Sequence, residues 1–123
     1  MMRIRIKWPK GELVAALDDT PTARALAATL PADSRANTWG EEVYFPLPVC
    51  VAKEPDAKQV VPPGTVCFWV EGGALALPYG RTPVSQGSEC RLVTSVNVLG
   101  RIEGDPRALA GVRDGDPIEV AAI

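Results

Sequence analysis

The sequence predicts a mainly β protein, a closed or nearly closed barrel of about eight strands with one main α-helix at about residues 21–30. In several short segments apolar side chains alternate with polar ones, which is typical of strands with one face in the core. The 12 prolines and 11 glycines fall mostly between these segments, where they favour turns. Only one segment has the spacing of a helix. Many short strands and a lone helix favour a barrel over two separate sheets.

The chain begins with a predicted hairpin. Residues 4–8 alternate apolar and charged side chains, and residues 9–11 contain the proline and glycine of a turn. Residues 12–17 can return as a second strand, although alanine is depleted in strands. This hairpin leads directly into the helix.

The helix has recognisable start and stop signals. Thr20 offers a hydroxyl at the N-cap, and Pro21 occupies the first helical position. A proline at position 31 ends the pattern. A helix this short is marginal alone and must pack on a sheet. Its predicted apolar face consists of Ala23, Leu26, Ala27 and Leu30.

The rest of the chain predicts further strands joined by turns. Residues 33–38 are polar and predict an irregular segment, and residues 53–58 predict a charged loop. Gly72 and Gly73 predict a tight hairpin. Prolines at positions 46 and 48 predict a sheet edge or bulge, because proline cannot donate to a strand ladder. The predicted strands are residues 42–49, 65–70, 74–79, 92–99 and 118–122, with breaks at Gly100 and Gly104 and one helical turn near residues 107–112.

Length and composition predict one domain over residues 1–123, which is large enough to fold on its core without disulfides or a structural metal. The net charge is -2, and the basic residues are scattered, so we expect no nucleic-acid partner. The N-terminus lacks the apolar core of a signal peptide, and no run is long enough to span a membrane. We therefore expect a cytoplasmic protein with no membrane partner. The oligomeric state stays open.

The side chains that usually perform catalysis are scarce. The chain has no histidine, which removes the commonest general base and metal ligand. Cys50, Cys67 and Cys90 are too widely spaced for a zinc or redox pair, and we expect them to be small buried hydrophobic residues. No phosphate-binding loop or facing carboxylate pair is present. We therefore predict no metal site and no cofactor.

Five features follow one another in an order that suggests a known family. They are the helix start at residues 20–21, the strand at residues 39–45, Pro63-Gly64 before Trp69, the turn at residues 80–83 and the tail at residues 97–104. This order resembles the cyclophilin barrel, and more closely a small family of uncharacterised prokaryotic cyclophilin-like proteins. The resemblance covers essentially the full length and implies a cyclophilin-like fold.

The resemblance does not extend to the catalytic motif. Cyclophilins carry their catalytic arginine in a Phe-His-Arg motif on the strand after the helix, where this chain offers Glu and Tyr within residues 41–45. Prolyl isomerisation as cyclophilins perform it needs a positive donor near the proline nitrogen, which weakens the amide resonance that sets a rotation barrier of about 20 kcal/mol. A carboxylate has the wrong sign. Arg81 in a neighbouring loop is the one candidate replacement.

The strand at residues 42–45 also suggests a binding groove. Val43 and Phe45 share the face expected in the core, which leaves Glu42 and Tyr44 on the outer wall. A solvated surface would explain this pair equally well. If a groove exists, its other wall would come from one of Phe68 and Trp69 and from the segment after the second hairpin. The predicted ligand-binding residues are Glu42, Tyr44, Tyr79, Arg81 and Thr82.

These observations leave three functional hypotheses. The leading one is a cofactor-free domain that binds a peptide or small molecule in this groove, without normal prolyl isomerase catalysis. The second is an enzyme with weak peptidyl-prolyl cis-trans isomerase activity or another histidine-independent activity, such as a hydrolase, which rests on fold analogy. The third is a protein-interaction module that uses a sheet edge near Pro46 and Pro48.

Overall fold

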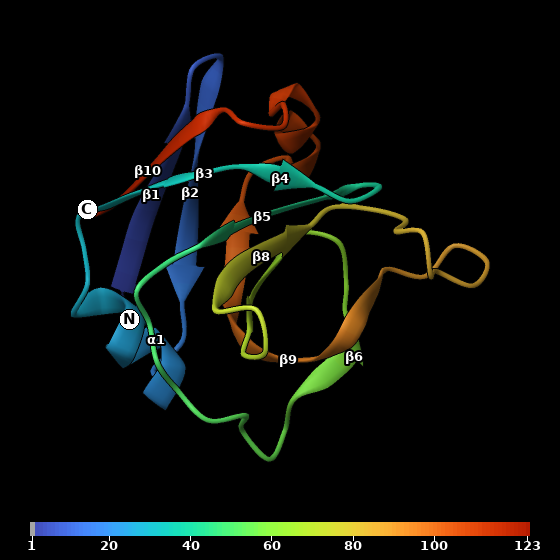
Figure 1. Ribbon diagram of the computed structural model, residues 1–123, viewed down its shortest axis with the longest axis horizontal. Helices are drawn as coiled ribbons and strands as arrows, with labels where there is room; N and C mark the ends of the chain where they lie inside the picture. The colour runs from blue at the N-terminus through green and yellow to red at the C-terminus, as the bar shows by residue number, and fades with distance from the viewer. Residues whose placement is uncertain (1) are drawn as a thin grey trace.

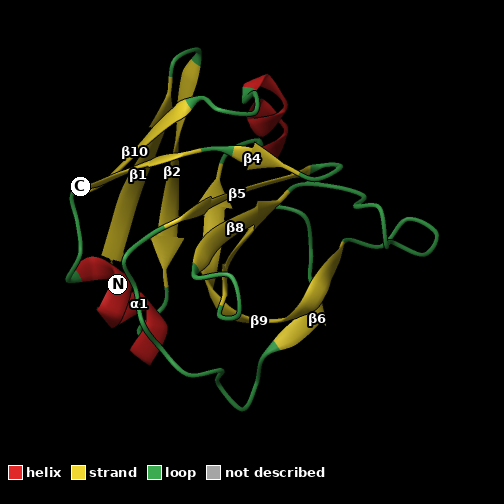
Figure 2. Cartoon of the chain, in the orientation of Figure 1, coloured by secondary structure: helices red, strands yellow, loops and turns green. Residues whose placement is uncertain are grey.

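Strands dominate the structure, a computed structural model that describes residues 2–123 (Figure 1). Within this range there are ten strands, one short α-helix and one 3-10 helix (Figure 2). The strands are β1 (Met2–Trp8), β2 (Gly11–Leu17), β3 (Ala32–Arg35), β4 (Asn37–Thr38), β5 (Glu42–Pro46), β6 (Lys58–Val60), β7 (Thr65–Trp69), β8 (Ala74–Pro78), β9 (Arg91–Glu103) and β10 (Pro117–Ala122). The helices are α1 (Pro21–Ala27) and the 3-10 helix η1 (Pro106–Gly111).

All strands are joined by antiparallel pairing in the order β3-β10-β1-β2-β9-β7-β8-β5-β4, and β6 pairs with the first part of β9. The mainly β class with one short α-helix is confirmed. The predicted barrel is not closed, because the end strands β3 and β4 are not hydrogen-bonded to each other. The physical reason lies in the chain itself: only Ala36 separates β3 from β4, and consecutive parts of one extended segment cannot lie side by side as a ladder.

The inner faces of the strands enclose the main core. In β1 the buried residues alternate with exposed ones, as the period-two pattern predicts. Val43 and Phe45 of β5 are buried in the same core, which confirms the predicted inward face of that strand. Leu26 anchors α1 to it and is fully buried. The alternating side chains of β5, Glu42 and Tyr44, therefore face away from the main core.

Helix α1 is held by its cap and by a buried polar network. The Thr20 hydroxyl accepts a hydrogen bond from the Ala23 amide at 3.0 Å, as predicted for the N-cap. Two residues after the cap, Thr22 is fully buried, donates to the Glu54 carboxylate and accepts from Asn97 Nδ2 at 2.9 Å. Asn97 Oδ1 in turn accepts from the Glu54 amide at 2.7 Å. This network ties α1, β9 and the loop at residues 52–54 together, because buried polar groups need partners.

Two predictions about the strands are wrong. Residues 33–38, expected to be irregular, form most of β3 and β4, because they pair with β10 and β5. Gly100, expected to end a strand, lies inside the thirteen residues of β9. A Cβ atom there would lie 2.0 Å from the Ala16 carbonyl oxygen, so glycine permits the close approach of β2 to β9. Tertiary pairing, which a local pattern does not contain, decided both cases.

Several predicted boundaries also shift. The helix ends at Ala27 instead of residue 30, and β5 ends at Pro46 instead of residue 49. Strand β5 pairs with β8 along residues 42–46 but with β4 only at Val43 and Tyr44, so its far end at Pro46 has a strand partner on one side only, as the prolines predicted. The helical turn expected near residues 107–112 is confirmed as η1.

The cap of α1 and its core contact should contribute differently to the free energy of unfolding. We expect Thr20→Ala to lower the free energy of unfolding by about 1 kcal/mol, because one hydrogen bond of the first turn is lost. We expect Leu26→Ala to lower it by roughly 2 to 5 kcal/mol, because a cavity forms in the core. Urea denaturation measures both, and equal small losses would contradict this packing.

Candidate functional site

The site begins at the hairpin between β4 and β5. The Trp39 amide donates to the Glu42 carbonyl at 3.0 Å, which makes these two residues opposite partners across the turn. Gly40 closes the turn with a φ of 60°, and a Cβ atom there would lie 2.9 Å from the Arg81 carbonyl oxygen. Because partners in an antiparallel pair share a face, the turn brings Trp39 beside Glu42 on the outer side of β5.

The outer face of β5, β8 and β7 carries a row of aligned side chains. Tyr44 is paired with Ala76, which is in turn paired with Cys67. Trp69 lies two residues beyond Cys67 and therefore shares its face. The rings of Tyr44 and Trp69 meet edge to face, with centroids 5.9 Å apart and planes at 89°.

A second layer covers this outer face. Residues at the start of β9 pair with β6 instead of β7, so β9 bends over the row (Figure 1). Its buried Leu92 and Val96 pack with Cys67 and Ala76 in a second apolar cluster, against which Tyr44 and Trp69 rest. The outer wall of the sheet thus becomes the floor of a pocket instead of a solvated surface.

The pocket has a volume of about 190 Å³. Three aromatic rings, three aliphatic side chains and one carboxyl group surround it. The lining residues, referred to below as the Glu42 pocket, are Trp39, Glu42, Tyr44, Trp69, Leu92, Val93 and Val96.

Two residues that line the Glu42 pocket each carry a buried polar atom without a hydrogen-bond partner. These atoms are Glu42 Oε1 and Trp69 Nε1, and they are the buried side-chain polar atoms left unpaired within residues 2–123. Only 5% of Glu42 is exposed. Each unpaired buried group costs roughly 1 to 3 kcal/mol, so native structures keep few of them. Their presence in one small pocket marks it as the site of interest.

Burial sets the charge state of the pocket. It raises the pKa of Glu42 to about 7, because the charged carboxylate is poorly solvated. It also raises the pKa of Cys90 to about 11, with a smaller contribution from Glu42, and raises the pKa of Cys67 further. Both thiols are therefore protonated and inert near neutral pH. Cys67 and Cys90 are buried as expected, whereas Cys50 is exposed, so that expectation was wrong for Cys50.

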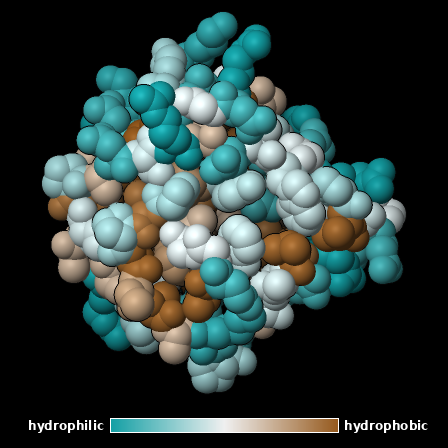
Figure 3. Space-filling view, in the orientation of Figure 1, coloured by the Kyte–Doolittle hydropathy of each residue, from teal (hydrophilic) through white to brown (hydrophobic). Residues whose placement is uncertain are grey.

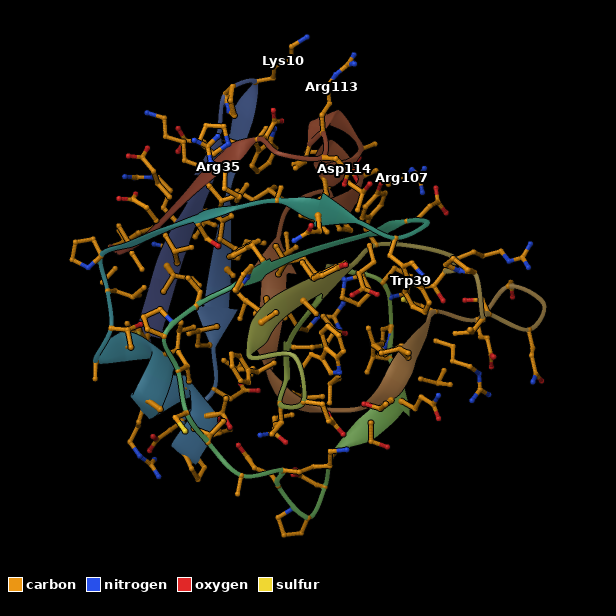
Figure 4. The ribbon with its side chains drawn as sticks, viewed as in Figure 1. Lys10, Arg35, Trp39, Arg107, Arg113 and Asp114 are labelled. Atoms are coloured by element: carbon orange, nitrogen blue, oxygen red, sulfur yellow. The ribbon has the colours of Figure 1, made fainter. Side chains whose placement is uncertain are left out.

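The neighbouring carboxylate has a different role. Glu41 accepts hydrogen bonds from the Arg107 guanidinium at 2.7 Å and from the Arg81 amide at 3.1 Å. These contacts lower the pKa of Glu41, the Arg107 contact most strongly. Arg107 also lies 5.6 Å from the ring centre of Tyr79. Figure 4 shows Arg107 and Trp39 on opposite sides of the β4–β5 hairpin, so this cluster is separate from the Glu42 pocket.

The predicted ligand-binding residues divide into two groups. Glu42 and Tyr44 lie together in the Glu42 pocket, whereas Tyr79 packs in the main core beneath Arg107. Arg81 is exposed, and its guanidinium donates to the Ser85 carbonyl at 3.4 Å. Thr82 is buried and donates to the Arg91 carbonyl, which closes the loop. None of these last three lines the pocket.

Sequence reasoning missed several pocket residues. Counting by two along residues 39–45 puts Trp39 on the same face as Val43 and Phe45, but the turn at Gly40 reverses the chain and places Trp39 opposite Glu42. Trp69 was one of two alternatives, and the other, Phe68, is buried in the main core. Leu92, Val93 and Val96 carried no signal, because only the bend of β9 brings them over β5. Recognising Trp39–Glu42 as a tight hairpin would have found Trp39.

The described part of the chain contains neither a metal-binding cluster of side chains nor a membrane-spanning helix. Within residues 2–123, no group of three or more cysteine, aspartate or glutamate side chains is arranged to hold a metal ion. Neither helix described there is long and apolar enough to cross a membrane.

Comparison with known proteins identifies the family. The profile of the cyclophilin-like family matches residues 2–121, so the chain belongs to the cyclophilin-like family. The fold is also similar to the solution structure of the hypothetical protein AF2241 from Archaeoglobus fulgidus. That match has 40% sequence identity and a TM-score of 0.85, and it covers 99% of this chain and 95% of the other. No curated protein matches the chain.

The buried carboxyl of Glu42 predicts an unusual dependence of stability on pH. Its raised pKa means that the folded protein holds a proton that the unfolded chain releases near its ordinary value of 4.5, so the free energy of unfolding falls as pH rises. The loss is complete above about pH 7 and amounts to roughly 3 kcal/mol. No histidine titrates in this window, and the lowered pKa of Glu41 places its titration below it.

Urea denaturation between about pH 5 and pH 8 measures this effect. Glu42→Gln should flatten the curve and be the more stable protein at the upper end, because its amide carries no charge. Glu41→Gln should keep the slope of the original chain. A flat curve for the original chain would show that Glu42 is solvated or paired.

Proposed function

We propose that this cyclophilin-like protein binds a small molecule, or one side chain of a peptide, in the Glu42 pocket, without catalysing prolyl isomerisation. The observation that carries the proposal is the presence of two unpaired buried polar atoms, Glu42 Oε1 and Trp69 Nε1, in one apolar pocket. A ligand that offers one donor and one acceptor would pair both. Ligand pockets commonly combine apolar walls with a few polar groups in this way.

The size of the pocket limits the ligand. Its volume of about 190 Å³ is close to that of an engineered apolar cavity of about 150 Å³ that binds benzene. It is smaller than the range of about 300 to 1,000 Å³ that is usual for drug-sized ligands. A small metabolite or a single side chain therefore fits better than an extended peptide.

The charges near the pocket disfavour prolyl isomerisation. The lining residues include a carboxyl group and no cation. Arg81 donates to the loop carbonyl of Ser85, and Arg107 is paired with Glu41. A positive donor near the proline nitrogen would have to come from elsewhere. We expect no rate acceleration in a peptidyl-proline isomerisation assay.

One observation favours a second candidate function. A carboxyl group with a pKa of about 7 is suited to general acid–base catalysis near neutral pH. Glu42 could therefore transfer a proton to or from a bound molecule in a histidine-independent enzyme. Turnover of a bound compound that stops in Glu42→Gln, while binding persists, would support catalysis over simple binding.

The surface pattern gives less support to a protein-interaction module. On the face shown in Figure 3, hydrophobic residues form one run at the lower left and small groups elsewhere, with hydrophilic residues around them. Extended docking faces usually have larger continuous apolar areas. The sheet edge near Pro46 is also short, because at that end of β5 only residues 45–46 lack a second strand partner.

A panel of fragment-sized compounds tests the proposed function. Val93 lies at the rim of the pocket and is 48% exposed, so Val93→Phe should narrow the entrance at little cost in stability. We expect compounds that raise the melting temperature of the original chain to lose at least tenfold in affinity for this variant, measured by ligand-observed NMR.

Val84→Phe is the matched control, because Val84 is 41% exposed and lies outside the pocket. It should bind like the original chain. Hits that bind Val93→Phe and Val84→Phe equally would place the ligand elsewhere and refute the proposed site.

A further inference from the structure

The aromatic rings of the Glu42 pocket come from three different parts of the fold. Trp39 belongs to the β4–β5 hairpin, Tyr44 to β5 and Trp69 to β7. Tyr44 and Trp69 stand at 89° to each other, so the rings do not stack into a single flat platform. Walls at right angles surround a small guest on more than one side. The negative face of an aromatic ring attracts a cation within about 6 Å of its centre.

The only carboxyl group in the lining adds to this preference. Glu42 is the one acidic side chain among the lining residues, and no basic side chain lines the pocket with it. Its Oε1 atom is buried and unpaired. A neutral apolar ligand would seal this carboxyl further from water and leave it without a partner. A cationic ligand would supply the missing charge.

The apolar character of the walls limits which cation fits. Metal ions such as Ca²⁺ and Mg²⁺ need several oxygen ligands, whereas the pocket offers one carboxyl among aromatic and aliphatic groups. A bare ammonium is compact and strongly hydrated, so apolar walls replace its water poorly. An ammonium that carries methyl groups presents an apolar surface with a diffuse positive charge, which matches rings and a carboxylate together.

The unpaired Trp69 Nε1 gives a second requirement. An indole N–H is only a donor, so a cation cannot pair it. An oxygen acceptor on the same ligand would do so. A single ligand that carries both a positive group and an oxygen acceptor would pair both unpaired atoms, Glu42 Oε1 and Trp69 Nε1.

We propose that the Glu42 pocket selects a small methylated ammonium compound that also carries an oxygen acceptor. The inference deepens the proposed function and rests on it. The cation lies among Trp39, Tyr44 and Trp69 beside the Glu42 carboxylate, and the oxygen accepts from Trp69 Nε1. A free metabolite presents this chemistry in one small molecule, whereas a methylated lysine of a peptide supplies the cation from its side chain and the oxygen acceptor from its backbone carbonyl.

Isothermal titration at about pH 8 tests the proposal with a matched pair of probes, since carboxylates are mostly ionised there. Choline and its neutral isostere 3,3-dimethyl-1-butanol have the same shape and differ in charge. We expect choline to bind at least tenfold more tightly, because its neutral isostere makes no cation–π contact and leaves the Glu42 carboxylate unpaired. A short peptide containing trimethyllysine, compared with the same peptide containing lysine, distinguishes the peptide source from the free metabolite.

Two variants test the roles of the polar groups. Glu42→Gln should reduce the preference for choline over its isostere, because the carboxylate is lost while the rings remain, whereas Glu41→Gln, which removes the neighbouring carboxylate outside the pocket, should leave the preference unchanged. Trp69→Phe keeps a ring and removes the N–H. It should weaken choline more than tetramethylammonium, which has no oxygen to lose a hydrogen bond.

The outcomes separate this inference from the proposed function. Equal binding of choline and 3,3-dimethyl-1-butanol would overturn the preference for a cation and leave the pocket as a binding site. Failure of choline, tetramethylammonium and the trimethyllysine peptide to bind would also overturn it. In that case the fragment panel with Val93→Phe and Val84→Phe still decides whether the pocket binds anything.

Discussion

The bend of β9 is the constraint on which the candidate site depends. Its second part, with Gly100 close against β2, belongs to the main sheet, whereas its first part pairs with β6 and covers the outer face of β5, β8 and β7. Without that cover, Glu42 and Tyr44 would face water on an ordinary sheet surface. With it, the carboxyl of Glu42 is enclosed among apolar side chains, and burial shifts its pKa. One strand thus contributes to both the fold and the pocket.

Local sequence patterns predicted the parts of the fold that local physics controls. The alternation in β1, the capped start of α1 at Thr20 and the inward Val43 and Phe45 follow from residue spacing and hydrogen-bonding chemistry. The pairing of β3 and β4 was missed because their polar residues become strands only through their partners. The strand break predicted at Gly100 was wrong for the same reason. Glycine is needed there because the neighbouring strand β2 approaches closely, and a local sequence pattern does not show which strands are neighbours.

The candidate site was predictable to the extent that it lies on one strand. The period of two placed Glu42 and Tyr44 on the same outer face, and the structure brings both into one pocket. Tyr79, Arg81 and Thr82 were grouped with them by their nearness in the predicted topology, yet Tyr79 faces the main core and the other two belong to a loop. Family membership supplies the fold and leaves the chemistry to these particular side chains.

The central claim is that Glu42 is a buried carboxyl group without a partner, and its titration tests this most directly. NMR detection of the side-chain carboxyl carbons from about pH 3 to about pH 9, with Glu42→Gln to assign the resonance, measures its pKa. The structure predicts a midpoint of about 7 for Glu42, because burial disfavours the carboxylate. A midpoint near 4.5, the ordinary value, would show that the carboxyl is solvated or paired and would contradict the account of the pocket.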